Sequence, residues 1–191
     1  LTTPHGDRHP VFMAYDMIPE VMGANLANPM WTEKHHGIRH ASAYIAISEN
    51  TPRDLVKCFP EISPESVTVA HWGIDKAFSP LTFVEVKQFK TKYGISKPYF
   101  LWVGDRVGFN GYKNALLFFK TFSQLDSKHD FEIVCVGGNS VLETELKAYP
   151  SDIPVHLLKL SDNELQSAYS GAIALVQTSK YEGFGLPILE A

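Results

Sequence analysis

Cysteine is scarce in this chain, which has two among its 191 residues, Cys58 and Cys135. They are too few and too far apart in sequence for a zinc knuckle, and Cys135 lies in an apolar run typical of a buried strand. We therefore expect both to be reduced thiols, which fits a cytoplasmic location.

Long apolar runs and an excess of positive charge are missing as well. No run of roughly 18 apolar residues occurs, so no membrane-spanning helix is predicted, and the start of the chain lacks the pattern of a signal peptide. The 17 basic and 21 acidic residues give a net charge of −4. That balance argues against a nucleic-acid-binding surface, which needs clustered Lys and Arg. Association with the periphery of a membrane stays open.

Several catalytic and cofactor motifs are also absent. The chain has no G-x-G-x-x-G, which disfavours a nicotinamide enzyme, and no G-x-S-x-G elbow, P-loop or Cys/His nucleophile, which leaves hydrolases and kinases without support. His36 and His40 are one helical turn apart beside His35, yet no acid completes H-E-x-x-H, and there is no D-x-D pair to hold a diphosphate through a divalent metal. We therefore expect neither a metal nor a cofactor.

The patterns that are present alternate between strand and helix, as in an α/β protein with parallel sheets. Residues 75–97, which carry Pro80, are predicted to connect two such units. The chain opens without Met and stops just after Pro187 begins a helix, so we expect a piece of a longer protein.

Strands are predicted over 11–15, 44–48, 66–70, 99–103, 131–136 and 172–177. Helices are predicted over 31–43, 52–58, 83–93 and 113–125, and after two capping boxes, Ser140–Glu143 and Ser161–Glu164.

The last ten residues are the most informative part of the sequence. Gly183 and Gly185 allow positive φ and close approach to a ligand, and Pro187 suits the first turn of a helix. The exposed amides of such a turn bind an anion, and carboxylates at Glu182 and Glu190 can accept hydrogen bonds from neutral hydroxyls. A nucleotide sugar is a ligand that combines an anion with several hydroxyl groups, so the run predicts a site for one.

A second candidate segment follows the strand predicted over 99–103. Gly104, Arg106 and Lys113 place a pliable backbone and two cations at the carboxyl end of that strand, where a helix begins. A diphosphate is bound well by a planar guanidinium such as that of Arg106, an ammonium group such as that of Lys113, and backbone N–H donors. Together these groups stabilise the charge on a leaving phosphate.

These segments resemble a known family. The run from Glu182 to Ala191 matches, residue for residue, the E-G-F-G-L-P-x-L-E-A wording of the E-x7-E signature of retaining glycosyltransferases of family 4 (group 1). The segment from Gly104 to Asn114 resembles that family's G-x-R-x-x-x-K-N, with a longer insertion over residues 108–111. The run from Tyr15 to Glu20 resembles its H-D-M-I-P-E loop, with Tyr15 in the position of the histidine.

The resemblance implies a GT-B fold of two Rossmann-like domains, of which only part of each is expected here. Residues 1–74 would be the end of the acceptor-side domain, 75–97 the interdomain connection and 98–191 the start of the nucleotide-sugar-binding domain. The implied activity is that of a hexosyltransferase of polysaccharide biosynthesis, transferring a sugar from a nucleoside-diphosphate sugar to a glycan, lipid-linked or other hydroxyl acceptor with retention of configuration. A piece of the enzyme need not be active by itself.

Roles for individual residues follow from the same resemblance. Arg106 and Lys113 would hold the diphosphate and stabilise it as it leaves, Glu182 would bind the donor sugar, and Glu190 the ribose. Asp16 is a candidate on the acceptor side, with capping of the following loop as its alternative role. The other residues expected to bind the donor are Gly104, Gly137, Ser161, Gly183, Phe184, Gly185 and Leu186.

Two other functions stay open at this point. The chain could be a nucleotide-sugar-binding module without turnover, or a sugar-nucleotide epimerase of the same two-lobed architecture. The donor base and sugar, the acceptor, the oligomeric state and the role of Tyr15 are not specified by the sequence.

Overall fold

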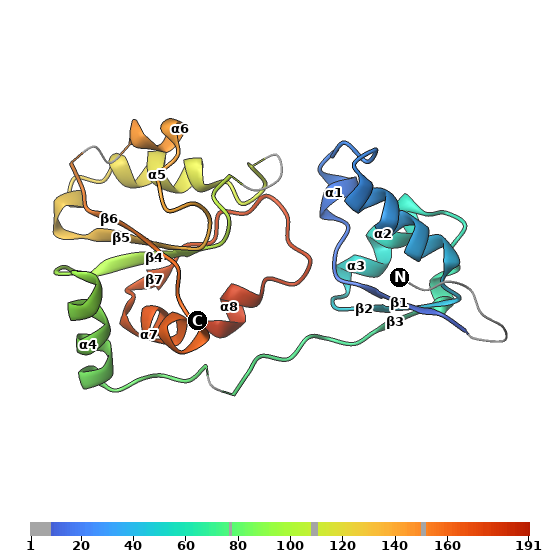
Figure 1. Ribbon diagram of the computed structural model, residues 1–191, viewed down its shortest axis with the longest axis horizontal. Coiled ribbons are helices and arrows are strands. Elements are labelled where there is room, and N and C mark those ends of the chain that lie inside the picture. Colours follow the sequence, from blue (N-terminus) through green and yellow to red (C-terminus); the bar gives the residue numbers. More distant parts are fainter. Residues whose placement is uncertain (1–8, 77, 108–110, 150–151) are drawn as a thin grey trace. The chain divides into compact units, whose positions relative to one another are not determined.

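The computed structural model describes residues 9–76, 78–107, 111–149 and 152–191. The chain divides into two compact units: unit 1 comprises residues 1–73 and 181–184, and unit 2 comprises 74–180 and 185–191. Each unit is built on a parallel sheet with helices packed against it (Figure 1). The predicted α/β class with parallel sheets is therefore confirmed.

Unit 1 contains a three-stranded sheet of order β1-β2-β3. Both strand pairs are parallel, with Tyr44 opposite Phe12 on one side and Val67 on the other. The elements are β1 (Val11–Ala14), α1 (Ile18–Val21), α2 (Pro29–His40), β2 (Ala43–Ala46), α3 (Asn50–Cys58), the 3-10 helix η1 (Pro64–Ser66) and β3 (Val67–Val69).

The core of unit 1 lies on the face of the sheet that carries α1, α2 and α3 (Figure 1). Along β1, Phe12 and Ala14 face this core, whereas Val11 and Met13 on the other face are 57% and 43% exposed. This alternation follows from the two-residue period of a strand. The buried core residues are Ala14, Met17, Ile38, Tyr44, Leu55, Phe59 and Ile62.

Unit 2 contains a four-stranded parallel sheet of order β6-β5-β4-β7. The chain runs outward from β4 through β5 to β6 and then crosses to the other side of β4, so the direction of winding reverses next to β4. The elements are α4 (Phe83–Tyr93), β4 (Tyr99–Val103), α5 (Ala115–Ser123), the 3-10 helix η3 (Lys128–Asp130), β5 (Glu132–Val136), α6 (Thr144–Lys147), β6 (Val155–Leu158), α7 (Asp162–Gly171), β7 (Ala174–Leu175) and α8 (Leu186–Glu190).

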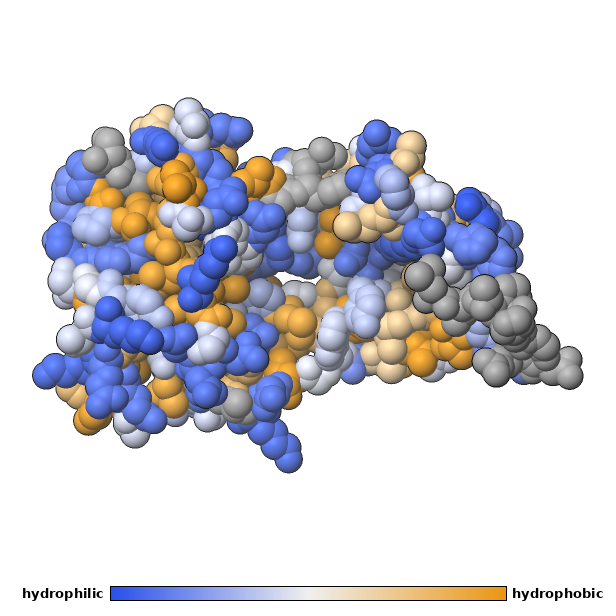
Figure 2. Space-filling model, viewed as in Figure 1, coloured by the Kyte–Doolittle hydropathy of each residue, from blue (hydrophilic) through white to orange (hydrophobic). Residues whose placement is uncertain are grey.

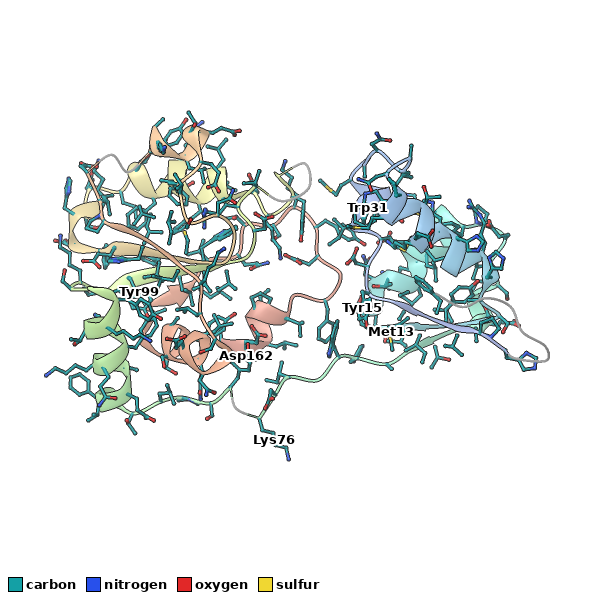
Figure 3. The ribbon with its side chains drawn as sticks, viewed as in Figure 1. Met13, Tyr15, Trp31, Lys76, Tyr99 and Asp162 are labelled. Carbon is teal, nitrogen blue, oxygen red and sulfur yellow. The ribbon has the colours of Figure 1, made fainter. Side chains whose placement is uncertain are left out.

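The sheet of unit 2 is covered on both faces, with α5 and α6 on one side and α4 and α7 on the other (Figure 1). Alternate residues of β4 and β5 face the two layers: Trp102 and Cys135 pack with α5, whereas Leu101 and Val134 pack with α7. The Tyr99 hydroxyl, at the start of β4 (Figure 3), donates to the carbonyl of Ala168 over 2.7 Å. Burial on both faces explains why β5 reads as an apolar run.

The helix predicted over 83–93 has these bounds in the structure. Thr82 and Glu85 form a capping box at its start, and Gly94, with φ of 68°, ends it in the left-handed conformation. α4 packs against α7, so most of the segment expected to connect the domains is built into unit 2. The donor-side and acceptor-side roles of the units stay predictions.

One strand was missed and one local prediction was wrong. β6 was not predicted, because Val155–Leu158 is four residues long and uniformly half-buried, so it shows no alternation. Ser140 and Glu143 do not form a capping box: α6 begins after Glu143, whose side chain makes no capping hydrogen bond and instead binds Arg106. The box at Ser161 and Glu164 is confirmed.

The surface carries mixed polarity. On the face drawn in Figure 2, hydrophobic and hydrophilic residues are interspersed over both units. In the described ranges, no helix is long and apolar enough to cross a bilayer.

Candidate functional site

The candidate residues of unit 2 gather at one edge of its sheet. All strands are parallel, so the loops that follow β4, β5, β6 and β7 leave from the same, carboxyl edge. Gly104 follows β4, Gly137 follows β5, Ser161 comes shortly after β6, and the run to Gly185 follows β7. Open α/β sheets bind ligands at this edge, where the strand order reverses, which here is between β4 and β7.

Glycines allow the loops after β4 and β5 to touch through their backbones. The Gly104 amide donates to the carbonyl of Val136 over 2.9 Å. A Cβ added to Gly137, which has φ of 94°, would lie 2.8 Å from the Gly104 oxygen. A side chain at residue 137 would therefore force the two loops apart.

Arg106 joins the same two loops, and its side chain is fully buried. Nε donates to Glu143 Oε2 over 2.8 Å, Nη1 donates to the carbonyl of Gly137 over 2.8 Å, and Nη2 donates to the carbonyl of Asn139. Burial raises the pKa of Glu143, but the hydrogen bonds and charge of Arg106, a backbone hydrogen bond and the Asn139 amide together outweigh it and leave that pKa below its usual range. The guanidinium expected at a diphosphate is thus turned into the protein, where it fixes the loop.

Lys113 lies on the other side of the loop, toward β7. Its Cε would be 3.5 Å from a Cβ built on Gly104, which places its stem over the end of β4, and Nζ lies 5.3 Å from the centroid of the Tyr112 ring. The Thr178 hydroxyl donates to the Lys113 carbonyl over 3.0 Å, and the Lys180 amide donates to the Tyr112 carbonyl over 2.8 Å. These bonds join the loop after β4 to the segment after β7. Residues 108–110 of the predicted insertion lie outside the described residues.

A cavity of about 330 Å³ borders this loop near the start of α5. It is partly enclosed, and its lining combines charged and apolar side chains. The lining residues are Arg106, Val107, Gly111, Asn114, Ala115, Leu116, Glu143, Glu145, Leu146 and Lys180.

The segment after β7 leads into α8 as the sequence predicts. Gly185, with φ of 87°, is the residue before the helix, and Pro187 lies in its first turn. Sequence reasoning missed a partner of Glu190: the buried Tyr169 hydroxyl donates to Glu190 Oε2 over 2.8 Å. Burial, together with this hydrogen bond, raises the pKa of Tyr169 well above its usual value. In the sequence Tyr169 reads only as an apolar position of α7, so no signal marked it.

Glu182, Gly183 and Phe184 belong to unit 1. A Cβ on Gly183 would lie 2.6 Å from the Tyr15 carbonyl oxygen and 2.7 Å from the Asp16 Cβ, so the turn packs directly on the Tyr15–Asp16 loop. The two acids of the terminal run therefore lie in different units, Glu182 in unit 1 and Glu190 in unit 2.

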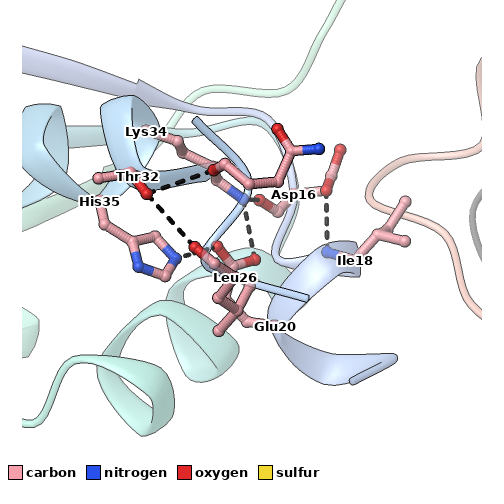
Figure 4. Close-up of polar contacts among 8 residues, drawn as sticks. Asp16, Ile18, Glu20, Leu26, Thr32, Lys34 and His35 are labelled. Carbon is pink, nitrogen blue, oxygen red and sulfur yellow. Dashed lines mark hydrogen bonds and ion pairs between the residues drawn. The ribbon is translucent and has the colours of Figure 1, made fainter. Parts of the chain in front are cut away.

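A cluster of charged residues holds the Asp16 loop in place (Figure 4). Lys34 Nζ donates to the Asp16 carbonyl and to Glu20 Oε2, both over 2.9 Å, and His35 Nε2 lies 2.8 Å from Glu20 Oε1. Asp16 Oδ1 accepts from the Ile18 amide over 2.9 Å and so holds the turn that leads into α1. Fixing the following loop is thus one role of Asp16, and its acceptor-side role stays a prediction.

Other candidates of the sequence have local partners. Ser161 is engaged with Glu164, its amide and hydroxyl donating to Oε2 over 3.0 and 2.8 Å. His40 Nδ1 lies 2.9 Å from the carbonyl of His36. Within the described ranges, no group of three or more His, Cys, Asp or Glu is placed to hold a metal ion.

Comparison with known proteins supports the sequence resemblance. Residues 85–191 match the model of the family described as glycosyl transferases group 1. No curated protein sequence matches the chain.

Solved structures share the fold at low sequence identity. The crystal structure of WaaG, a glycosyltransferase involved in lipopolysaccharide biosynthesis, superposes with a TM-score of 0.74 at 16% identity, over 95% of this chain and 53% of that one. Alr3699/HepE of Anabaena, in complex with UDP and glucose, gives a TM-score of 0.73 at 16% identity, over 95% of this chain and 49% of that one. The GT-B fold expected from the resemblance is confirmed. The chain spans about half the length of these structures.

Proposed function

The chain belongs to the glycosyl transferases of group 1, and from that premise we propose that it contributes to transfer of a sugar from a nucleoside-diphosphate sugar to a hydroxyl acceptor. We further propose a hexosyl donor, membership of family 4 and retention of configuration. The observation that carries the proposal is the hydrogen-bonded junction of the loop after β4 with the segment after β7, through Thr178 and Lys180, at the switch point of the sheet.

In the proposed donor site, Lys113 and Arg106 have different roles. Lys113, over the end of β4, carries the charge that stabilises the departing diphosphate. Arg106 has its three nitrogens engaged inside the protein, which supports a positioning role for it in this arrangement. Gly104 and Gly137 keep the two loops close enough for backbone donors to face the phosphates.

In this proposal, Glu190 and Glu182 accept hydrogen bonds from the hydroxyl groups of the ribose and of the donor sugar. Tyr169 binds one oxygen of Glu190, which orients the carboxylate and leaves its other oxygen for the ribose. Amides near Gly185 and Leu186 meet phosphate or sugar oxygens, and Glu182 with the Gly183 turn binds the donor sugar. Gly137 and Ser161 border the nucleobase. No enzymic nucleophile is invoked: the acceptor attacks from the face that the diphosphate leaves.

Partner and location remain part of the proposal. The neighbour HepE was crystallised with UDP-glucose, which supports a nucleotide sugar as donor. Action in the cytoplasm and association with the periphery of a membrane stay predictions. Neither a metal nor a cofactor is proposed.

The direct test replaces Lys113. In the full-length protein, with UDP-glucose, GDP-mannose and ADP-glucose as donors, Lys113→Ala should lower the release of nucleoside diphosphate roughly 10²-fold while the melting temperature stays unchanged. The matched control is Lys120→Ala, since Lys120 is an exposed cation of α5. Equal rates for both variants would remove Lys113 from the mechanism. Binding of all three donors without any release would instead indicate a module without turnover.

Glu190→Gln tests binding separately from turnover. Glutamine keeps an acceptor for Tyr169 but loses the charge, so we expect a smaller rise in melting temperature with nucleoside diphosphate. Tyr169→Phe should give a partial loss, because the orienting hydroxyl is removed and the carboxylate remains. If Glu190→Gln has the same ligand-induced shift as the wild type, the ribose assignment is wrong.

A further inference from the structure

Two aromatic side chains of unit 1 lie in contact outside its core. The rings of Tyr15 and Trp72 have centroids 5.1 Å apart and planes inclined by 36°. Tyr15 is 50% exposed and Trp72 is 43% exposed. Aromatic side chains contribute most when they are buried in a core or an interface, so an exposed pair is a candidate contact surface.

The pair lies at the carboxyl edge of the sheet in unit 1. Tyr15 directly follows β1, and Trp72 comes shortly after β3, the two strands that flank β2. Tyr15 continues the exposed side of β1 that begins with Val11 and Met13 (Figure 3). The carboxyl edge of an open parallel sheet is where small ligands bind.

Polar groups border the aromatic pair. Asp16 is next to Tyr15, and one of its oxygens is used by the Ile18 amide. His71 is next to Trp72, and its Nε2 lies 3.6 Å from Glu49 Oε1, with both side chains mostly exposed. The ring of Phe184 lies 6.1 Å from that of His71 and adds apolar surface.

This combination fits one ligand chemistry better than others. A pyranose ring has a face of C–H groups, which packs on an aromatic plane, and a rim of hydroxyls, which bind carboxylates and imidazoles. A phosphate group is disfavoured, because Asp16 and Glu49 would repel it. A nonpolar chain would displace water from these polar side chains without replacing its hydrogen bonds.

We propose that Tyr15 and Trp72 form a stacking platform for a pyranose ring of a carbohydrate acceptor, whose hydroxyls bind Asp16 and His71. This inference depends on the proposed function and narrows its acceptor from any hydroxyl compound to a glycan. It also gives a role to Tyr15, the position at which the sequence departs from the histidine of the family pattern.

Binding can be followed at Trp72 itself. The indole N–H resonance of Trp72, assigned with Trp72→Phe, is monitored by NMR during titration with methyl glycosides of glucose, galactose, mannose and N-acetylglucosamine in both anomers. At least one glycoside should shift this resonance, while that of the buried Trp102 stays fixed. Sorbitol, which has hydroxyls but no ring, should have no effect. If no glycoside shifts Trp72 up to roughly 50 mM, where even millimolar affinity would register, the platform is refuted.

Variants separate stacking from general surface effects. Tyr15→Ala should weaken the effective glycoside about fivefold to tenfold, as expected for one lost aromatic contact, and Tyr15→Phe should restore it. Met13→Ala is the control, because Met13, in the strand that Tyr15 directly follows, is exposed to a similar extent. Equal affinity of Tyr15→Ala and Met13→Ala would overturn the proposal.

Acceptor and donor are distinguished by a second readout. Tyr15→Ala should raise the KM for the acceptor glycoside and leave both the donor-induced melting shift and the release of nucleoside diphosphate without acceptor unchanged. A loss of the donor-induced shift would assign the platform to the donor sugar and contradict the inference. If no donor gives a shift or release, the proposed function fails, whereas a glycoside shift at Trp72 would still establish a carbohydrate site.

Discussion

Unit 1 and unit 2 each hold a loop at the carboxyl edge of a sheet by means of an ion pair, but they differ in where the cation comes from. In unit 1, the cation is Lys34, which lies in α2, outside the loop, and binds the Asp16 carbonyl and Glu20. In unit 2, the cation is Arg106, a residue of the loop itself, paired with Glu143. A cation in a ligand-binding loop can therefore be used to build the loop, and sequence position alone does not reveal which use it has.

The burial of the two pairs predicts different costs of breaking them. The Arg106 side chain is 0% exposed and that of Lys34 is 18% exposed. Water can replace part of what Lys34 provides, whereas nothing replaces the guanidinium between two loops. The largest expected effect in the chain is therefore at Arg106.

Arg106→Met should lower the free energy of unfolding of unit 2 by about 3 kcal/mol, because it leaves Glu143 and two carbonyls without their donor. Lys34→Met should cost unit 1 about 1 kcal/mol. Urea unfolding of both variants measures the difference. Equal losses of unfolding free energy would show that the two ion pairs stabilise their units to the same extent, and the distinction between them would be wrong.

Gly183→Ala probes the loop of unit 1 from its other side. The new methyl group would meet the Tyr15 carbonyl at 2.6 Å, and backbone cannot yield cheaply, so we expect a loss of about 1–3 kcal/mol. Gly73→Ala is the matched control in the same unit, because nothing lies within 4 Å of its added Cβ. The comparison is made by thermal melting, and two similar melting temperatures would contradict the packing of the Gly183 turn on the Asp16 loop.

The smallest expected effect concerns pH and the opposite edge of unit 2. Glu132 accepts from the Ser96 hydroxyl over 2.7 Å and lies 2.8 Å from His156 Nε2. Burial raises its pKa, but these hydrogen bonds outweigh burial and hold the pKa below its usual value. Its stabilisation is therefore complete above the unfolded pKa of about 4.3 and is lost as pH falls through the lower folded value.

Urea unfolding at several pH values between roughly 6 and 3 measures this contribution. The wild type should lose stability on acidification more steeply than Glu132→Gln, whose side chain does not titrate. Parallel pH profiles would show that the carboxylate contributes no pH-dependent stability.

Local structure was predictable from the sequence where it depends on residues that are close together in the chain. The bounds of α4 follow from a capping box and a terminal glycine, and the glycine turn before Pro187 follows from the conformations those residues favour. β6 was missed because four half-buried residues carry no periodic signal. Glu143 was misread as a cap because the stronger partner of its carboxylate, Arg106, is distant in sequence.

The sequence by itself determined the α/β class, the group 1 signature and which residue types lie at the ends of the strands. Only the tertiary structure decided that Arg106 is turned inward, that Tyr169 binds Glu190 and that Tyr15 meets Trp72. The physical reason is that such pairings depend on strand order and on the length of side chains across a sheet edge. Neither quantity is encoded in a local pattern, because each becomes fixed only when distant segments pack together.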